Sequence, residues 1–136
     1  SMRLYPPGPF IGREAIEDDV LGGFHIPAGS TIALCQYATH RRPDLWPNAL
    51  TFDPERFSDE RRSEIPAYAY FPFGGGSRVC IGQTLGMMEG VLTLARVSRG
   101  FRMTPPAGAG EFPPRPMSLV SLRPSNPIRL KMEPRT

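Results

Sequence analysis

The stretch Phe71-Pro-Phe-Gly-Gly-Gly-Ser-Arg-Val-Cys-Ile-Gly-Gln83 places one cysteine, Cys80, between a glycine-rich loop and the start of an expected helix. A cysteine at a helix N-terminus faces free amide groups and the positive end of the helix dipole, and both favour its thiolate form. The three glycines at 74–76 permit backbone conformations closed to other residues and a close approach to a flat ligand. The stretch therefore predicts a thiolate held against a large planar ligand.

The other fixed positions around Cys80 suit the same chemistry. Arg78 carries a guanidinium that can pair with a carboxylate, and Phe73 can shield the sulfur from water. Gly82 leaves room where the expected helix passes beneath the ligand. The pattern thus combines a soft metal ligand, a cation that can bind an anion, and an uncrowded surface.

Rival uses of a glycine loop or a cysteine fit less well. A phosphate loop would end in Gly-Lys-Ser/Thr, and a dinucleotide fingerprint would need glycine where Val79 stands. A catalytic cysteine needs a histidine base, and neither His25 nor His40 lies in a recognised nucleophile motif. The two cysteines and two histidines are not spaced like a zinc site. Besides a role as a ligand, three interpretations of Cys80 remain open: a buried inert cysteine, a disulfide with Cys35, and a redox sensor that works without a cofactor.

Composition bounds the protein class. The 136 residues allow one domain with a modest core, and 17 prolines with 14 glycines predict short elements joined by many turns. The net charge of +3 comes from scattered arginines with no basic run longer than two residues, which argues against nucleic acid as a partner. No apolar run reaches the ~18 residues of a membrane span and no signal peptide is visible, so we expect a cytoplasmic chain without a membrane segment of its own, an upstream anchor being left open.

The N-terminal half predicts small antiparallel hairpins followed by a long irregular meander. Residues 20–26 are expected to form two strands around a Gly-Gly turn, with a type I turn at 26–29 and a strand within 30–37. Positions 38–66 form the meander, with a short helical turn capped by Thr39 and aromatic anchors at 46, 52 and 57.

The C-terminal half predicts one long buried helix over 82–99, because apolar residues lie on two of its faces. Gly86 and Gly90, four residues apart, would let another element pack close to its backbone, and Gly100 would end it. A proline- and glycine-rich loop over 104–116 precedes an expected final hairpin of 117–122 with 128–132. The fold class is therefore α+β.

The spacing Phe73-x-x-Gly76-x-Arg78-x-Cys80-x-Gly82 resembles the haem-binding signature of the cytochrome P-450 haem-thiolate monooxygenases. Further matches follow in the family's order: Arg3 resembles the arginine of its Glu-x-x-Arg motif, and Phe52-Asp-Pro-Glu-Arg-Phe57, with His40-Arg-x-Pro43 upstream, resembles its later arginine motif. The resemblance covers the whole chain but only the C-terminal part of that fold, so residues 1–136 are expected to be a single partial domain.

The resemblance implies haem b as cofactor and Cys80 as its axial iron ligand. Arg78 would pair with one haem propionate and Arg13 with another. His40 would either bind a propionate as well or hydrogen-bond the meander as a structural histidine. The remaining residues implied at the cofactor are Phe73, Gly76 and Gly82. Gly8, Phe10 and Ile11 resemble the segment that lines the distal pocket, and 117–121, with Val120, resembles the last substrate-contact turn.

The resemblance also implies an activity for the complete enzyme. It would insert one oxygen atom from O2 into a small apolar substrate, with electrons from a ferredoxin or a flavoprotein reductase. For the chain alone we expect weak haem binding and no turnover, since the family's proton-delivering central helix is not in it. The alternative is a truncated, non-catalytic module that binds haem or a partner chain and self-associates through apolar faces.

The start of the chain raises a separate question about charge. It begins one residue too late to hold the family's glutamate, either because it is cut from a longer protein or because Ser1 is a cloning remnant. Arg3 and Arg56 would then lack their shared carboxylate, and an unpaired buried charge costs about 3–5 kcal/mol. Glu55 and Glu89 are the candidate replacements.

Overall fold

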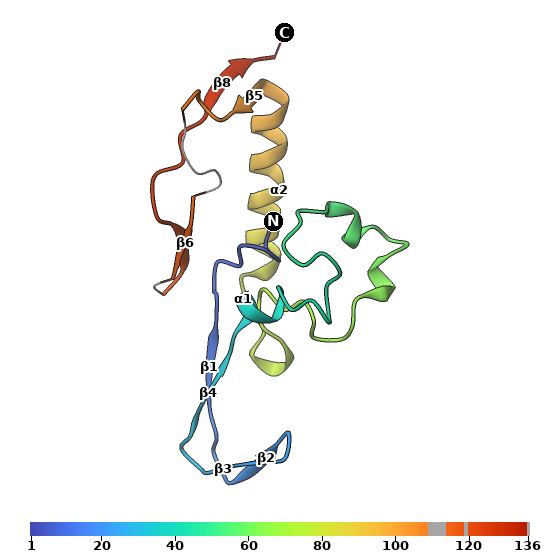
Figure 1. Ribbon diagram of the computed structural model, residues 1–136, viewed down its shortest axis with the longest axis vertical. Helices are drawn as coiled ribbons and strands as arrows, with labels where there is room; N and C mark the ends of the chain where they lie inside the picture. Colours follow the sequence, from blue (N-terminus) through green and yellow to red (C-terminus); the bar gives the residue numbers. More distant parts are fainter. Residues whose placement is uncertain (109–113, 119, 136) are drawn as a thin grey trace.

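The computed structural model describes residues 1–108, 114–118 and 120–135. Within them, short strands form two-stranded antiparallel pairs on either side of an irregular segment, and one long helix runs along the molecule (Figure 1). The strands are β1 Ile11–Glu14, β2 Asp19–Leu21, β3 Phe24–Ile26, β4 Thr31–Leu34, β5 Phe101–Thr104, β6 Pro116–Ser118, β7 Leu122–Pro124 and β8 Lys131–Pro134. The α-helices are α1 Gln36–Thr39 and α2 Gln83–Gly100, and the 3-10 turns are η1 Pro54–Phe57, η2 Arg62–Glu64 and η3 Gly76–Arg78.

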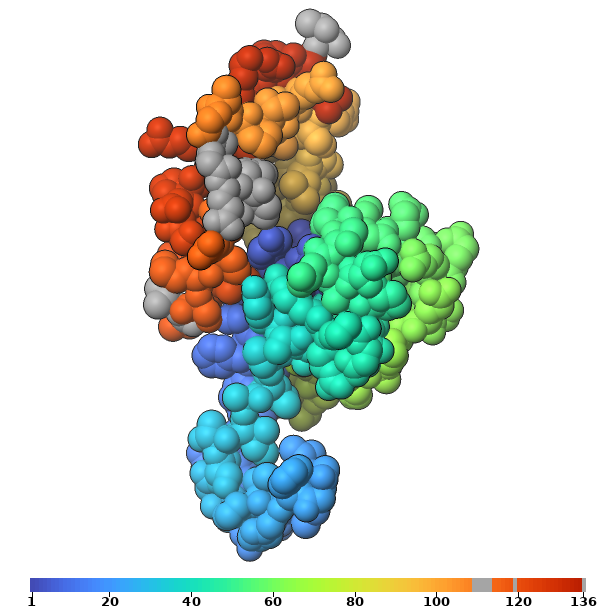
Figure 2. Space-filling model, viewed as in Figure 1, coloured from blue at the N-terminus to red at the C-terminus, as the bar shows by residue number. Residues whose placement is uncertain are grey.

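The first two pairs form an extended arm. β1 pairs with β4 from Ile11 opposite Leu34 to Glu14 opposite Thr31, and the β2–β3 hairpin lies at the far end of this ladder (Figure 1). In the space-filling view the hairpin forms a lobe that protrudes from the rest of the molecule (Figure 2). Gly22 and Gly23 both have positive φ, 60° and 86°, as a two-residue turn matched to the strand twist requires. The predicted pair of strands around this turn is confirmed.

Two local predictions in this region are wrong. The turn closes one residue later than expected, since the Ser30 N–H donates to the Pro27 carbonyl at 3.1 Å and Gly29 takes a φ of 76° at the third position. A glycine at that position with positive φ is typical of a type II turn, not type I. The helical turn α1 begins directly after β4 with Cys35 at its N-cap, so Thr39 is its last residue and not its cap.

The main hydrophobic cluster lies in the meander and the residues that directly follow it. Trp46, Ala49 and Ala69 are buried, and the partly buried side chains of Leu45, Phe57, Ile65 and Tyr70 pack against them. The Trp46 and Phe57 rings are 6.1 Å apart between centroids, which confirms two of the three aromatic anchors. Phe52 is 65% exposed and is not an anchor. Rings from three parts of the segment hold this long loop in place without regular secondary structure.

The long helix is present but not buried. α2 spans Gln83–Gly100, close to the predicted 82–99, yet the apolar side chains on both of its faces are exposed, Leu92 at 62%. Among the described elements β5, which follows it directly, is its main neighbour. The expected burial is therefore wrong for this chain, because the elements described here do not cover the helix.

The final hairpin was predicted with the wrong partners. β6 pairs with β7, Pro116 opposite Pro124, whereas β8 returns to pair with β5, Phe101 opposite Pro134. The predicted strand 128–132 overlaps β8 only at Lys131 and Met132, and the partner of β8 is β5, the strand that leaves α2. The predicted strand 117–122 instead spans the end of β6 and the start of β7. Part of the predicted loop over 104–116, residues 109–113, lies outside the described residues.

Candidate functional site

Cys80 lies between η3 and α2, at the base of a closed loop. Its N–H donates to the Phe73 carbonyl at 2.9 Å, and its carbonyl accepts from the Gln83 N–H at 3.2 Å, where α2 begins. Cys80 and Cys35 are both exposed, free thiols. The inert buried cysteine and the disulfide are therefore both wrong, and the sulfur is accessible at the helix N-terminus, as the sequence predicted.

The glycines of this loop serve two different needs. Gly74 and Gly76 adopt φ values of 77° and 66°, a region that side chains other than glycine rarely enter. Gly82 has an ordinary backbone, with φ −83°, so glycine there would serve space beside the sulfur and not backbone conformation. A Cβ on Gly82 would lie at an ordinary van der Waals distance of 3.8 Å from the Cys80 sulfur.

A cavity of about 440 Å³ opens beside the cysteine loop, facing the end of the β1–β4 ladder. Its lining residues are Ile11, Arg13, Leu34, Thr39, Tyr68, Phe71, Gly75 and Gly76. The Arg13 side chain is half-buried, and its Nη1 donates to the Gly12 carbonyl at 2.8 Å. Arg78 ends η3 and is exposed. The structure thus brings Arg13 and Ile11 together beside Gly75 and Gly76 of the glycine loop.

His40 lies beneath this loop and is fully buried. Its Nε2 accepts a hydrogen bond from the Phe71 N–H at 3.0 Å, and its ring stacks against those of Tyr70 and Phe71. Burial lowers the pKa of His40 to about 4, so the ring is neutral at pH 7. Of the two roles predicted for His40, this geometry favours the structural one.

Arg3 is buried and donates three hydrogen bonds to backbone. The acceptors are the carbonyls of His40 at 2.7 Å, Ala49 at 2.6 Å and Thr51 at 2.9 Å. Its guanidinium also lies 5.1 Å from the centroid of the Trp46 ring. Carbonyl dipoles and an aromatic face therefore contact this cation directly, and the Asp53 carboxylate attracts it from a longer distance.

Arg56 is also buried and finds a different acidic neighbour from the two predicted. Its Nη2 donates to the Asn48 carbonyl at 3.1 Å, and its Nε lies 3.7 Å from a carboxylate oxygen of Asp53. Asp53 also caps η1 by accepting from the Glu55 N–H. The candidates Glu55 and Glu89 are thus wrong, because the three-residue spacing within η1 brings Asp53 to Arg56.

The two segments predicted to contact substrate lie side by side. The Leu122 N–H donates to the Pro7 carbonyl at 2.8 Å, which joins the stretch before Gly8 to the hairpin that carries Val120. Phe10 is 52% exposed and Val120 is 96% exposed, while position 119 lies outside the described residues. Among the described residues, neither Phe10 nor Val120 lines the cavity beside Gly75 and Gly76.

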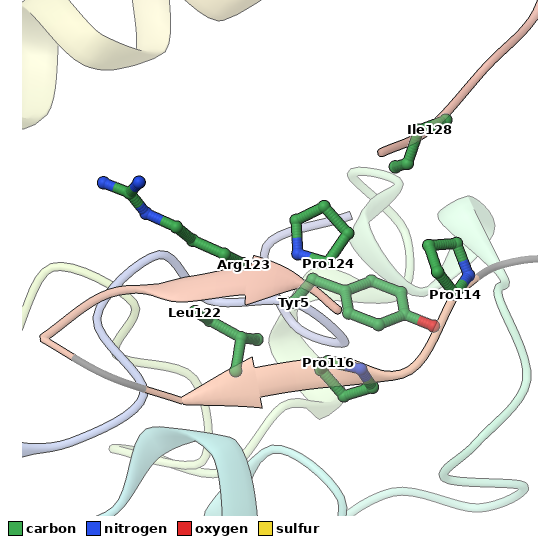
Figure 3. Close-up of a pocket in the computed structure, with 7 residues that line it drawn as sticks. All are labelled: Tyr5, Pro114, Pro116, Leu122, Arg123, Pro124 and Ile128. Atoms are coloured by element: carbon green, nitrogen blue, oxygen red, sulfur yellow. The ribbon is translucent and has the colours of Figure 1, made fainter. Parts of the chain in front are cut away.

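A second cavity, of about 260 Å³, lies between this hairpin and Tyr5. Figure 3 shows the Tyr5 ring among Pro114, Pro116 and Pro124, while Arg123 extends away from them. The lining is almost entirely apolar. It is lined by none of the predicted site residues and shares no lining residue with the cavity beside Gly75 and Gly76.

Sequence reasoning missed Tyr68, which lines the cavity beside Gly75 and Gly76. Tyr68 has a φ of 59°, and its ring packs against Gly75. Nothing in the local sequence marks it, since a Tyr in a run of aromatic residues reads as core.

Comparison with known proteins identifies the family. The cytochrome P450 family model matches residues 1–132, so the chain belongs to the cytochrome P450 family, whose members bind haem b.

Particular relatives agree with this assignment. Cyclooctatin synthase of Streptomyces melanosporofaciens is 41% identical over 99% of this chain, and thromboxane-A synthase of Rattus norvegicus is 45% identical over 75% of it. This chain spans 28% and 19% of those two proteins.

Solved structures give the same result for the fold. A cytochrome P450DA haem domain superimposes with a TM-score of 0.90 at 29% identity, over 99% of this chain and 29% of that one. A retinoic acid-bound cyanobacterial CYP120A1 gives 0.89 at 34% identity, over 98% and 30%. Within 1–108, 114–118 and 120–135, no helix is both long enough and apolar enough to cross a membrane.

The cysteine loop fits the family's cofactor. It offers one exposed soft ligand, Cys80, on a backbone whose glycines leave its surface open. Arg13 on the neighbouring cavity and Arg78 at the loop's end supply cations for carboxylates. A thiolate suits iron in a haem, and guanidinium groups suit haem propionates.

Proposed function

We propose that this chain supplies the cysteine side of the haem site of a monooxygenase, with the Cys80 thiolate as the axial ligand of the iron. The observation that carries the proposal is the exposed Cys80 at the start of α2, in a loop built on positive-φ glycines. Cys80 lies just before α2, the end of the helix whose free amide groups attract negative charge. The hydrogen bond from Cys80 to Phe73 holds the sulfur at the surface of the loop.

The surrounding residues would bind and orient the cofactor. Arg78 and Arg13 would each pair with a haem propionate, and Phe73 would limit access of water to the sulfur. Gly76 and Gly82 would leave the loop surface clear. His40 would hold the loop from behind through Phe71.

The proposed activity belongs to the complete enzyme. Haem, when bound, would supply the activation of O2 and the insertion of one oxygen atom into a small apolar organic substrate. Gly8, Phe10, Ile11 and Val120 would line the substrate side. Electrons would come from a ferredoxin or a flavoprotein reductase.

A haemin titration of the 136-residue chain tests the ligand assignment. The reduced, carbon-monoxide-treated protein is expected to show the red-shifted Soret band of a thiolate-ligated haem. Cys80→Ala should abolish that band, whereas Cys35→Ala, the matched change at the other exposed free cysteine, should leave it unchanged. A thiolate-type band that survives Cys80→Ala would overturn the assignment.

A second candidate function rests on the uncovered helix. Apolar side chains on both faces of α2 are exposed, and contiguous apolar surface of this kind marks association. The chain would then act as a non-catalytic module that binds haem or a partner and self-associates.

A further inference from the structure

Tyr68 is held in a costly backbone conformation. Its φ of 59° lies in the left-handed region, where a bulky side chain is an outlier. Asn48 is the other non-glycine residue with positive φ among those described, but asparagine tolerates this region. The Tyr68 residue is 72% exposed, so burial of its side chain does not offset the cost. Such strain persists where surrounding structure imposes it, and it concentrates at functional sites.

The ring lies against the glycine loop. Its Cε1 and Cδ1 atoms are 3.0 and 3.6 Å from the point that a Cβ on Gly75 would occupy. The side chain also lines the cavity of about 440 Å³ that contains Arg13 and Gly76. The left-handed backbone of Tyr68 therefore places an aromatic ring in the wall of the cavity that Arg13 also lines, and Arg13 is the cation proposed to bind a propionate.

We propose that Tyr68 is a positioning residue for haem, and this rests on the function proposed above. Its ring would form the outer wall of the cavity beside Arg13 and support the loop at Gly75. A wall that keeps water from Arg13 would strengthen its attraction to a carboxylate, because charges interact more strongly where the surroundings are less polar. The ring carries this role, and the phenolic hydroxyl does not.

Three variants separate this role from ordinary packing. Tyr68→Gly removes the ring and relieves the backbone, and Tyr68→Phe keeps the ring. Asn48→Gly places glycine at the other non-glycine residue with positive φ among those described, which is not among the residues lining the cavity. Apo-protein thermal unfolding should give Tyr68→Gly a midpoint no lower than wild type, since glycine adopts positive φ freely. Haemin should nevertheless bind Tyr68→Gly about tenfold more weakly and transfer faster from it to excess albumin. Tyr68→Phe and Asn48→Gly should bind haemin as wild type does.

Each other result overturns the inference. Unchanged haemin affinity in Tyr68→Gly would remove the role of the ring, and a loss in Tyr68→Phe as large as in Tyr68→Gly would assign it to the hydroxyl. A lower apo midpoint for Tyr68→Gly would make the residue merely structural. If wild type shows a Cys80-dependent thiolate spectrum while Tyr68→Gly binds normally, this inference alone fails. If wild type lacks that spectrum, the proposed function fails with it.

Discussion

Arg3 and His40 connect the first residues of the chain to the cysteine loop. The Arg3 guanidinium bonds the His40 carbonyl, and the His40 ring bonds the Phe71 N–H, two residues before Phe73. Both side chains are buried. Since the Phe73 carbonyl in turn accepts from the Cys80 N–H, these contacts tie the position of the sulfur to His40 and Arg3, which lie 40 and 77 positions before Cys80 in sequence.

His40 should make stability depend on pH. Its folded pKa of about 4 lies below the ordinary value of 6.5, so between these pH values the unfolded chain binds a proton that the folded chain does not. The free energy of unfolding should therefore fall as pH drops from about 6.5 to 4, by about 3 kcal/mol from this residue. Urea unfolding across that range measures it.

The contribution of His40 is isolated by comparing variants. His40→Gln keeps an acceptor for the Phe71 N–H and should lose this part of the pH dependence, because glutamine does not titrate. His25→Gln, a change at an exposed histidine on β3, should keep it. Equal pH dependence in wild type and His40→Gln would contradict the assignment.

At the scale of elements, the glycines of α2 differ in their surroundings from the glycines of the cysteine loop. Gly86 and Gly90 have no neighbouring atom within 4 Å of an added Cβ and have ordinary φ, so among the described residues nothing packs against them. The expected close approach is not made by this chain. Gly74, in contrast, has positive φ and the Ile11 Cδ1 atom at 3.4 Å from an added Cβ.

Gly86→Ala should therefore raise the free energy of unfolding by about 1 kcal/mol, because alanine has the higher helix propensity. The matched change Gly74→Ala should lower it by at least about 1 kcal/mol, because alanine is strained at φ 77°. Urea unfolding of the two variants provides the measurement. If Gly86→Ala destabilised the protein instead, an element would have to pack on that face.

At the scale of the molecule, the buried apolar core is small and lies in and just after the meander. Trp46, Ala49 and Ala69 form its main cluster, while large apolar side chains lie exposed on α2 and on the β2–β3 hairpin. Such a distribution leaves much apolar surface in water, and association would cover it.

Wild-type protein should accordingly associate as its concentration rises, and Leu92→Glu should shift it toward monomer. Leu92 is 62% exposed on α2, and a charge there would oppose burial of that face. Light scattering coupled to size-exclusion chromatography measures the mass. Leu50→Glu, at a 76% exposed leucine in the meander, is the control and should leave the association unchanged. A monomeric wild type at all concentrations would contradict this prediction.

The sequence by itself determined the features whose causes are local. Positive φ at Gly22, Gly23, Gly74 and Gly76 follows from turn and loop chemistry, and the long helix follows from a run of helix-forming residues after Cys80. The spacing around Cys80 was sufficient to indicate the family, which the family model then matched over 1–132.

Only the tertiary structure decided which distant groups meet. The pairing of β8 with β5, the support of Phe71 by His40, and the choice of Asp53 over Glu55 for Arg56 join residues through space. The exposure of α2 depends on which elements lie beside it, and periodicity reports only which side chains are apolar. Tyr68 belongs here too, because a strained φ and a ring against Gly75 result from chain path and leave no trace in residue order.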